Sequence, residues 1–389
     1  MSATRGASVS LRYVSPWRML GAILACAVTS ARAGNRTLLL AMSAGAWPVG
    51  PFMFEPAMST LRAGLEAYAR PNVRFAHAIL SRDQIAEKAA TLRPGDALVW
   101  LGFHGLEHVP WGALIRRGVR TVYYETEPIQ RCRYARLGIA EQWHYSWRNL
   151  DICRQSGPGS GMTHRYVPPG ALRTPTVSHA AKSPALTFLG NSRLSLGLRG
   201  PAWKHLRLKC LRRIRARLPG RVVDVQGLWN ESAFARHLLE GQHSIFVNVH
   251  KACGVSNQPL EAFRISKLLN YGALVVSERG YARDEAEYAQ LVDFTDPADI
   301  PERFLRYAAM GPTERAALAE GRAGDFARRF EPVALLAGAG VYEMLDEHFA
   351  RPLQPGKARN ATAPAKPAAE GAAAGTSEVP ALQTAEVLR

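Results

Sequence analysis

The stretch QPLEAFRISKLLNYGALVVSE, residues 258–278, contains one helix, one turn and one strand in order. Pro259 suits the first turn of a helix, because its ring fixes a helical φ and its missing N–H needs no partner there. The apolar residues that follow recur at helical spacing, and Gly272 is the residue type that ends helices. The apolar run after this glycine is typical of a buried strand. We therefore predict a helix over about 258–270 that returns directly into a strand.

The same alternation of apolar runs and amphipathic stretches extends along both halves of the chain. In the first half it predicts strands over 37–42, 73–78, 97–103, 120–124, 140–146 and 164–167, with helices over 56–69, 82–92 and 109–117. In the second half it predicts strands over 185–189, 222–225, 244–249, 273–277 and 291–294, with helices over 203–218, 231–240, 258–270, 301–309, 313–329 and 332–349. Apolar strands that do not alternate with polar residues indicate parallel sheets covered on both faces. The predicted fold class is α/β, with two Rossmann-like doubly wound domains and a cleft between them.

The length of 389 residues is too great for one ordinary core, which agrees with two domains. A polar, proline-containing linker at 168–184 separates the two series of elements. The predicted organisation is a targeting segment 1–33, domains over 34–170 and 185–330, a helix 332–350 that crosses back, and a disordered tail 352–389.

The first 33 residues have the pattern of a targeting segment. Basic residues up to Arg18 precede an apolar run at 19–30, and Ala31-Arg32-Ala33 then provides a small-x-small cleavage site. This pattern favours a secretory signal or a short signal anchor, and hence the secretory pathway or the Golgi lumen. An acid-free transit peptide for another organelle is the alternative, and a cytoplasmic location remains open.

The formal net charge of +17 is concentrated in two segments. Residues 1–54 and 204–221 contain no acid and supply 13 of the excess charges. Arginine outnumbers lysine 41 to 8, so a high pI says little about partners. No recognised nucleic-acid-binding motif accompanies the basic helix 203–218, which favours peripheral contact with an anionic membrane over nucleic-acid binding.

The five cysteines are scattered along the chain, at positions 26, 132, 153, 210 and 253, with no C-x-x-C pair. This spacing excludes a zinc ribbon or a thioredoxin-like redox motif. It also suggests no disulfide framework, so we predict buried free thiols.

In parallel α/β sheets, ligands bind beyond the carboxyl ends of the strands, so the residues just after each strand are candidates for a site. His250 and Lys251 follow one predicted strand, and Glu261 and Arg264 share a face one helical turn apart on the next helix. His250 and Lys251 are equally well explained as a surface pair. Glu261 and Arg264 are also explained as an ion pair across one turn.

At these residues the sequence resembles GT-B glycosyltransferases. Their C-terminal domain carries an L-E-A-containing helix and a G-x-x-V-V turn and strand, matched here by 260–262 and 272–276. The resemblance implies that Glu261 hydrogen-bonds the ribose of a nucleotide and that amides at a helix start face its diphosphate. A carboxylate suits vicinal hydroxyls because it accepts two hydrogen bonds, and the helix dipole suits phosphate.

The resemblance covers about residues 36–350. The segment FLGNSR at 188–193 stands where the family places a glycine and a basic residue near the diphosphate, which implies Gly190, Asn191 and Arg193, with Arg199 a weaker candidate. Segments 123–128, 143–149 and 167–170 are similar to glycosyltransferases of the family 1 and CgeB-like kind. One departure is Cys253, at the position where retaining members carry a second glutamate.

Candidates for acid–base chemistry lie in the first half of the chain. His104 follows a predicted strand where the family often has a catalytic histidine, although His108 and Glu107 are close by. Glu125 or Glu127 is a candidate base or a member of an internal ion pair.

The predicted function is transfer of a sugar from a nucleotide-sugar to a hydroxyl of a glycan, lipid or protein acceptor. No cofactor or metal is implied, because Arg193, Lys251, Arg264 and Lys267 provide charges to neutralise a leaving diphosphate. The alternatives are a catalytically inactive GT-B binding module and a basic protein that binds nucleic acid or a membrane surface.

Overall fold

The computed structural model describes residues 35–45, 54–132, 134, 137–155, 161–172, 182–189, 203–225, 231–240 and 243–352. The predicted targeting segment and nearly all of the predicted tail lie outside these residues, as does 173–181 of the predicted linker. No helix among the described residues is long and apolar enough to span a membrane.

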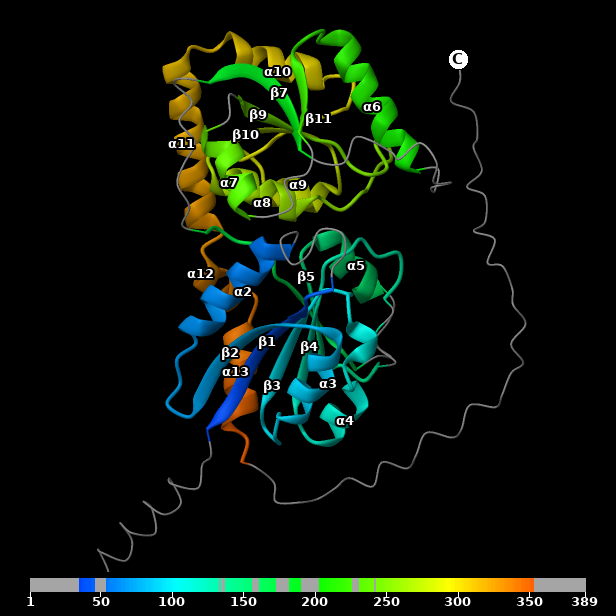
Figure 1. Cartoon of the computed structure of the whole chain (residues 1–389), viewed down its shortest axis with the longest axis vertical. Helices are drawn as coiled ribbons and strands as arrows, with labels where there is room; N and C mark the ends of the chain where they lie inside the picture. Colours follow the sequence, from blue (N-terminus) through cyan, green and yellow to red (C-terminus); the bar gives the residue numbers. More distant parts are fainter. Residues whose placement is uncertain are drawn as a thin grey trace, which may run out of the picture. The chain divides into compact units, whose positions relative to one another are not determined.

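Six parallel strands form the first sheet, in the spatial order β2-β1-β3-β4-β5-β6 (Figure 1). They are β1 (Arg36–Ser43), β2 (Val73–Leu80), β3 (Ala97–Leu101), β4 (Arg120–Glu125), β5 (Glu141–His144) and β6 (Thr163–Tyr166). The strand order reverses between β1 and β3. The crevice at the carboxyl ends of these two strands is therefore the expected ligand position in this sheet.

Helices cover both faces of the first sheet because its central strands are apolar on both sides. They are α2 (Glu55–Ala67), α3 (Arg82–Ala90), the short 3₁₀ helix η2 (Leu106–His108), α4 (Trp111–Arg116) and α5 (Trp147–Gln155). Leu38 and Leu40 of β1 point into the core that contains the buried face of α2. Leu39 and Ala41 point the other way, into the core formed with α3 and α4. This alternation is the period-2 geometry of a strand buried on both faces.

The second sheet has five parallel strands in the order β11-β10-β9-β7-β8. Its strands are β7 (Ser183–Leu189), β8 (Val222–Val225), β9 (His243–Asn248), β10 (Leu274–Glu278) and β11 (Asp293–Thr295). Its helices are α6 (Trp203–Arg217), α7 (Glu231–Glu240), α8 (Ala262–Asn270), α9 (Ala282–Glu287), α10 (Ile300–Ala309) and α11 (Pro312–Arg329). Here the order reverses between β7 and β9. The prediction of two doubly wound, Rossmann-like domains is confirmed.

The two faces of the second sheet pack against different helices. Phe188 and Val247 belong to the core shared with α6 and α10. Phe246 and Val275 belong to the core shared with α8, and that core is continuous with the α2 side of the first sheet. Helix α8 therefore links the two cores, and its first residues lie at the carboxyl ends of the second sheet's strands.

The predicted single helix over 332–349 is instead two helices, α12 (Pro332–Gly338) and α13 (Val341–Ala350). Gly340 separates them with a φ of 69°, a left-handed conformation that glycine adopts without strain. Both helices pack on the first sheet's side: Leu336 of α12 lies against Gly64 of α2, and the Tyr342 hydroxyl of α13 donates to the Gly64 carbonyl at 2.7 Å.

Helices α5 and α9, which the sequence pattern did not predict, carry contacts between the two sheets' domains. The Asp284 carboxylate on α9 accepts hydrogen bonds from the Ser146 hydroxyl and the Trp147 N–H, each at 2.7 Å. The Tyr281 hydroxyl donates to Asp151 of α5 at 2.8 Å. Burial raises the pKa of Asp284 to about 6, although the donated hydrogen bonds favour its ionised form.

The prediction of free thiols is wrong for four of the five cysteines. Cys132 forms a disulfide with Cys153, which is 21 positions away in the sequence, and Cys210 forms one with Cys253, which is 43 positions away. Spacing along the chain cannot reveal such pairs, because the fold brings them together. His164 lies beside Cys132 and Cys153, and the three residues have the spacing of a metal site, but sulfurs joined in a disulfide offer no thiolate to a metal.

Candidate functional site

Glu261 lies between two guanidinium groups at the carboxyl end of the second sheet. Its Oε1 accepts from Arg207 Nη2 of α6 at 2.6 Å, and its Oε2 faces Arg264 Nη2 of α8 at 3.1 Å. The three side chains are 21%, 13% and 16% exposed, respectively. Burial opposes ionisation of Glu261, but Arg264 and then Arg207 outweigh it and hold its pKa at about 2. The carboxylate is therefore fixed as an anion at neutral pH.

Glu261 stands just before the helix, contrary to the prediction that placed it within the first turn. Helix α8 begins at Ala262, and Glu261 has a non-helical ψ of 58°. The segment before the helix forms tertiary hydrogen bonds instead: the Gln258 carbonyl accepts from Tyr281 N at 2.7 Å, and Leu260 N donates to Asp284 at 3.3 Å. These bonds hold the chain next to α9 and delay the start of the helix.

Arg264 also connects this cluster to the end of β9. Its Nη1 donates to Asn248 Oδ1 at 2.9 Å, and Asn248 is in turn held by its own donation to Ser277 Oγ at 2.9 Å. The guanidinium carbons of Arg207 and Arg264 lie 5.8 and 5.7 Å from the ring centre of Phe188 in β7. The two cations thus converge beside β7 and β9, where the strand order of this sheet reverses.

His250 and Lys251, the predicted pair after β9, have different environments. His250 is 2% exposed, and its carbonyl accepts from Arg207 Nε at 3.2 Å. Burial lowers the pKa of its ring, whose Nε2 has no hydrogen-bond partner among the described residues. Lys251 is half exposed and faces Glu127 of the first domain at 3.7 Å.

Glu278, at the end of β10, fixes the backbone after β9. Its two oxygens accept from His250 N at 2.9 Å and from Gly254 N at 2.5 Å. Burial raises the pKa of Glu278 to about 7, against the effect of these two amides. The carboxyl group therefore acts as an internal support for the loop that follows β9.

His104 lies after β3, next to the reversal point of the first sheet. Its ring contacts Phe103 at 3.9 Å between centres and Phe54 at 6.3 Å, and Phe54 meets Phe263 of α8 edge-on at 5.8 Å. This chain of rings connects His104 to the helix that follows Glu261. Burial lowers the pKa of His104, opposed by Glu107, which favours the neutral form of the ring.

Glu125 is held inside the first domain. It is 1% exposed, and its Oε1 accepts from the Tyr123 hydroxyl and the backbone amides of Thr126 and Glu127 at 3.1–3.2 Å. Burial raises its pKa to about 7. Its oxygens are thus occupied by neighbours, whereas Glu127 reaches toward Lys251.

The structure brings together His250, Lys251, Glu261 and Arg264, and places His104 on the facing edge of the first sheet. Gly190, Asn191 and Arg193 lie outside the described residues, as does Arg199. Lys267 does not join the cluster: its buried side chain faces Glu55 of α2 at 3.9 Å.

Arg207 is the site residue that the sequence analysis missed, because it was grouped with the basic surface of its helix. A signal was present. Arg207 is three and four residues before Cys210 and Leu211, which places it on the apolar face of the helix. A cation at such a position needs an anionic partner or a ligand.

Comparison of the sequence with known protein families finds no match, and none is found among curated proteins. Solved structures are similar in fold. A trehalose-6-phosphate synthase, studied with bisubstrate glycomimetics for glycosyl transfer with retention, is 11% identical with a TM-score of 0.50, over 79% of this chain and 99% of that one. HepE from Anabaena in complex with UDP-glucose is 12% identical with a TM-score of 0.50, over 80% and 99%. The chain has the GT-B fold.

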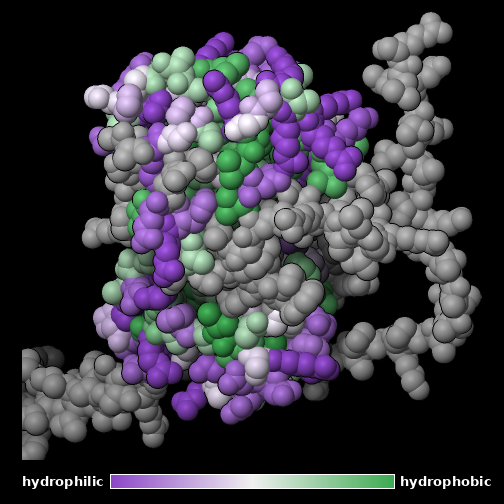
Figure 2. Space-filling view, turned by 45° about the horizontal axis from the view of Figure 1, so that its top comes forward, coloured by the Kyte–Doolittle hydropathy of each residue, from purple (hydrophilic) through white to green (hydrophobic). Residues whose placement is uncertain are grey.

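The cluster of Arg207, Glu261 and Arg264 lies at the carboxyl ends of the strands of the second Rossmann-like domain. On the face shown in Figure 2, the described residues are mostly hydrophilic, with hydrophobic side chains among them. Two of the exposed large hydrophobic residues, Phe103 and Val255, adjoin site residues of the two domains.

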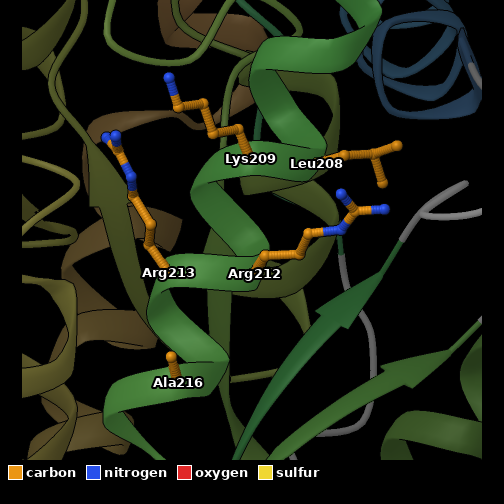
Figure 3. A pocket seen from close by; sticks show the side chains of 5 residues that line it. All are labelled: Leu208, Lys209, Arg212, Arg213 and Ala216. Carbon is orange, nitrogen blue, oxygen red and sulfur yellow. The ribbon is translucent and has the colours of Figure 1, made fainter. Parts of the chain in front are cut away.

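The outer face of α6 forms a second basic surface, away from Glu261. A hollow of about 460 Å³ is lined by Leu208, Lys209, Arg212, Arg213 and Ala216 (Figure 3). The three cations are exposed, and no acid of the described chain pairs with them, whereas Arg215 and Arg217 on the same helix pair with Asp224 and Glu302.

Proposed function

We propose that the chain is a glycosyltransferase that binds a nucleoside-diphosphate-sugar at the carboxyl end of the second sheet. The observation that carries this proposal is the convergence of Arg207 and Arg264 on Glu261 beside the strand-order reversal of a GT-B domain. Ligands of doubly wound sheets bind at that position.

The two guanidiniums suit the diphosphate. Each is a planar fork of donors that matches phosphate oxygens, and both are largely withdrawn from water, where charge–charge interactions are stronger. His250, next to Lys251 just after β9, is buried, and its Nε2 has no hydrogen-bond partner among the described residues. Together the two guanidiniums would stabilise the charge that develops on the leaving diphosphate, which is the usual source of rate acceleration in such a transfer.

Glu261 suits the ribose even though it is already paired. Each carboxylate oxygen has two acceptor directions, and the described contacts use one on each oxygen. The remaining directions are available to the vicinal hydroxyls. The arginines keep the carboxylate ionised, so it accepts charge-assisted hydrogen bonds at any pH well above 2.

His104 is the side chain we assign to acid–base chemistry. It follows β3 of the first domain, and burial lowers its pKa and so favours the neutral form, which a base that receives the acceptor's proton needs. Glu125 is left out of this assignment because its carboxyl group is enclosed by the hydrogen bonds of its own loop.

The acceptor is proposed to be a hydroxyl of a glycan, lipid or protein. A lipid-linked or membrane-bound acceptor would agree with the exposed cations of α6, each of which contributes about 1 kcal/mol of attraction near an anionic bilayer. Replacing Lys209, Arg212 and Arg213 with Glu should abolish sedimentation with phosphatidylserine vesicles at low salt and leave unfolding unchanged. Equal sedimentation of the variant and the wild type would remove this surface from the proposal.

The two disulfides support a location in the secretory pathway. Disulfides persist in oxidising compartments and are rare in the cytosol. Non-reducing gels of protein taken directly from its host cells, with thiols blocked at lysis, should show both bridges formed. Reduced cysteines in that sample would instead favour the cytoplasm.

A catalytically inactive GT-B module is the second candidate, favoured by Cys253 at the position of the second glutamate. Donor binding and donor turnover separate the two functions. An active enzyme releases nucleoside diphosphate from its donor when an acceptor is present, whereas the inactive module binds the donor and releases none.

The direct test is a thermal-shift screen of the full chain against UDP-, GDP-, ADP- and CMP-sugars, starting with UDP-glucose because HepE was solved with it. One donor class should stabilise the protein. Arg207→Ala and Arg264→Ala should each lower the affinity for that donor by roughly tenfold to a hundredfold, the equivalent of about 1.5–3 kcal/mol. Arg213→Ala, on the outer face of α6, is the matched control and should change affinity less than twofold. If no nucleotide-sugar binds, or if the three variants behave alike, the proposal is wrong.

A further inference from the structure

The disulfide Cys210–Cys253 joins helix α6 to the loop that follows β9. Both cysteines are buried, at 8% and 4% exposure, in the core between α6 and the second sheet. The bridge thus connects two segments that are separated in the sequence by β8, α7 and β9.

Each end of the bridge carries a residue of the proposed donor site. On the helix, Arg207 is three residues before Cys210, on the same face, and reaches both Glu261 and the His250 carbonyl. On the loop, Cys253 lies between Lys251 and Gly254, whose amide donates to Glu278.

The loop has little regular structure of its own. Gly254 and Asn257 have φ values of 79° and 60°, and a turn bond from Val255 N to the Ala252 carbonyl at 3.1 Å is the backbone hydrogen bond described within it. A loop of this kind depends on side-chain links for its position. Glu278 provides one such link and the disulfide provides another.

We infer that Cys210 and Cys253 are positioning residues of the donor site: their bridge, anchored in the loop after β9, holds Arg207 of α6 in the geometry that binds the diphosphate. This inference rests on the proposed function. Without the bridge, the helix and the loop shift independently, and a displacement of about 1 Å is enough to impair a bidentate contact.

The bridge is expected to act on the diphosphate and not on the base. Loss of the bridge should lower the affinity for UDP, or for the nucleoside diphosphate of the donor class found in the screen, by about tenfold. The affinity for the corresponding nucleoside should fall less than twofold, since the nucleoside has no phosphate for Arg207 to bind. A bridge that merely stabilised the fold would affect both ligands equally at temperatures where the protein stays folded.

The experiment measures UDP and uridine affinities by calorimetry for full-length wild type, Cys210→Ala/Cys253→Ala, and the matched control Cys132→Ala/Cys153→Ala. The control removes the other disulfide and should bind both ligands as wild type does. Arg207→Ala is then combined with the Cys210→Ala/Cys253→Ala pair. Because the bridge acts through Arg207, the combined variant should bind UDP no more weakly than Arg207→Ala alone.

If the double-cysteine variant fails to fold, the control variant serves for a second measurement, since this bridge is then its one remaining disulfide among the described residues. Dithiothreitol supplies the two electrons and two protons that convert the bridge to two thiols. UDP affinity should fall about tenfold on reduction and return on reoxidation. Unchanged UDP affinity, equal losses for UDP and uridine, or additive losses with Arg207→Ala would each overturn the inference. Absence of nucleotide binding by the wild type would remove the proposed function and the inference with it.

Discussion

Replacing Glu261 with Gln tests whether the carboxylate between Arg207 and Arg264 is a strongly stabilised anion. The substitution keeps the shape and an acceptor oxygen but removes the charge, leaving two largely buried guanidiniums without their anion. Burial opposes ionisation of Glu261, but Arg264 and Arg207 outweigh it and hold its pKa at about 2, below the usual 4.5, which corresponds to roughly 3 kcal/mol. At pH 7 the variant should therefore be less stable to unfolding by about this amount.

The stability difference between wild type and Glu261→Gln should depend on pH. A carboxyl group whose folded pKa is depressed contributes stability that is present above the unfolded value of 4.5 and lost as the pH falls through 2. The difference between wild type and Glu261→Gln should be full at pH 7 and should shrink steadily below pH 4.5. Urea unfolding at pH 7, 5 and 3.5 measures this difference.

Glu302→Gln is the matched control for this measurement. Glu302 also pairs with an arginine, Arg217, at 3.0 Å, but its side chain is 63% exposed. An exposed pair contributes about 1 kcal/mol at most, so the control should change stability little at any pH. If Glu261→Gln is as stable as wild type at pH 7, or if its deficit is the same at pH 3.5, the description of Glu261 as a charge-stabilised anion is refuted.

Three further predictions concern Glu125, two glycines and His104. Glu125→Gln should be more stable than wild type at pH 8 by up to roughly 3 kcal/mol. Burial raises the Glu125 pKa to about 7, so the stability that its protonated form contributes is full below pH 4.5 and is lost as the pH rises through 7. Equal unfolding profiles of the two proteins from pH 5 to 8 would contradict this. Gly280→Ala should destabilise the protein, since its Cβ would lie 2.8 Å from the Gln258 carbonyl oxygen. Gly321→Ala in α11 has open space around its Cβ and should raise the free energy of unfolding by about 0.5–1 kcal/mol. Thermal unfolding of both variants measures these effects, and a Gly280→Ala variant as stable as wild type would contradict the first. His104→Ala should slow sugar transfer to the acceptor, measured as release of nucleoside diphosphate, by about a hundredfold, with donor affinity changed less than twofold. A variant that turns over normally would exclude His104 as the base.

The sheets were predictable from the sequence because their strands are apolar on both faces. The core strands β1, β9 and β10 each begin and end within one residue of their predicted bounds. Gly272, with a φ of 69°, ends α8 as its residue type predicted. Local pattern is sufficient where burial is continuous along a strand.

Elements whose position depends on distant partners were not predictable in this way. Helix α8 starts at Ala262 because Asp284 and Tyr281 hold the preceding segment, and those contacts are more than 20 positions away in the sequence. The disulfides have the same origin. Helices α5 and α9 are short and carry polar contacts between domains, so they lack a strong apolar period.

The candidate site was predicted in part for the same reason. Glu261, Arg264 and His250 follow strands of one sheet, so the topology alone places them together. Arg207 comes from a helix on the sheet's flank, and only the packed structure shows that its guanidinium reaches Glu261.

Hydrogen exchange of the full chain, with and without the nucleotide-sugar that stabilises it, tests the central claim most directly. If the donor binds between Arg207, Glu261 and Arg264, amide exchange should slow in residues 249–254 and 260–264, at the carboxyl ends of the second sheet. Arg264→Ala should abolish this protection at the same ligand concentration. Protection that is absent from both segments, or that persists unchanged in Arg264→Ala, would show that the donor site lies elsewhere.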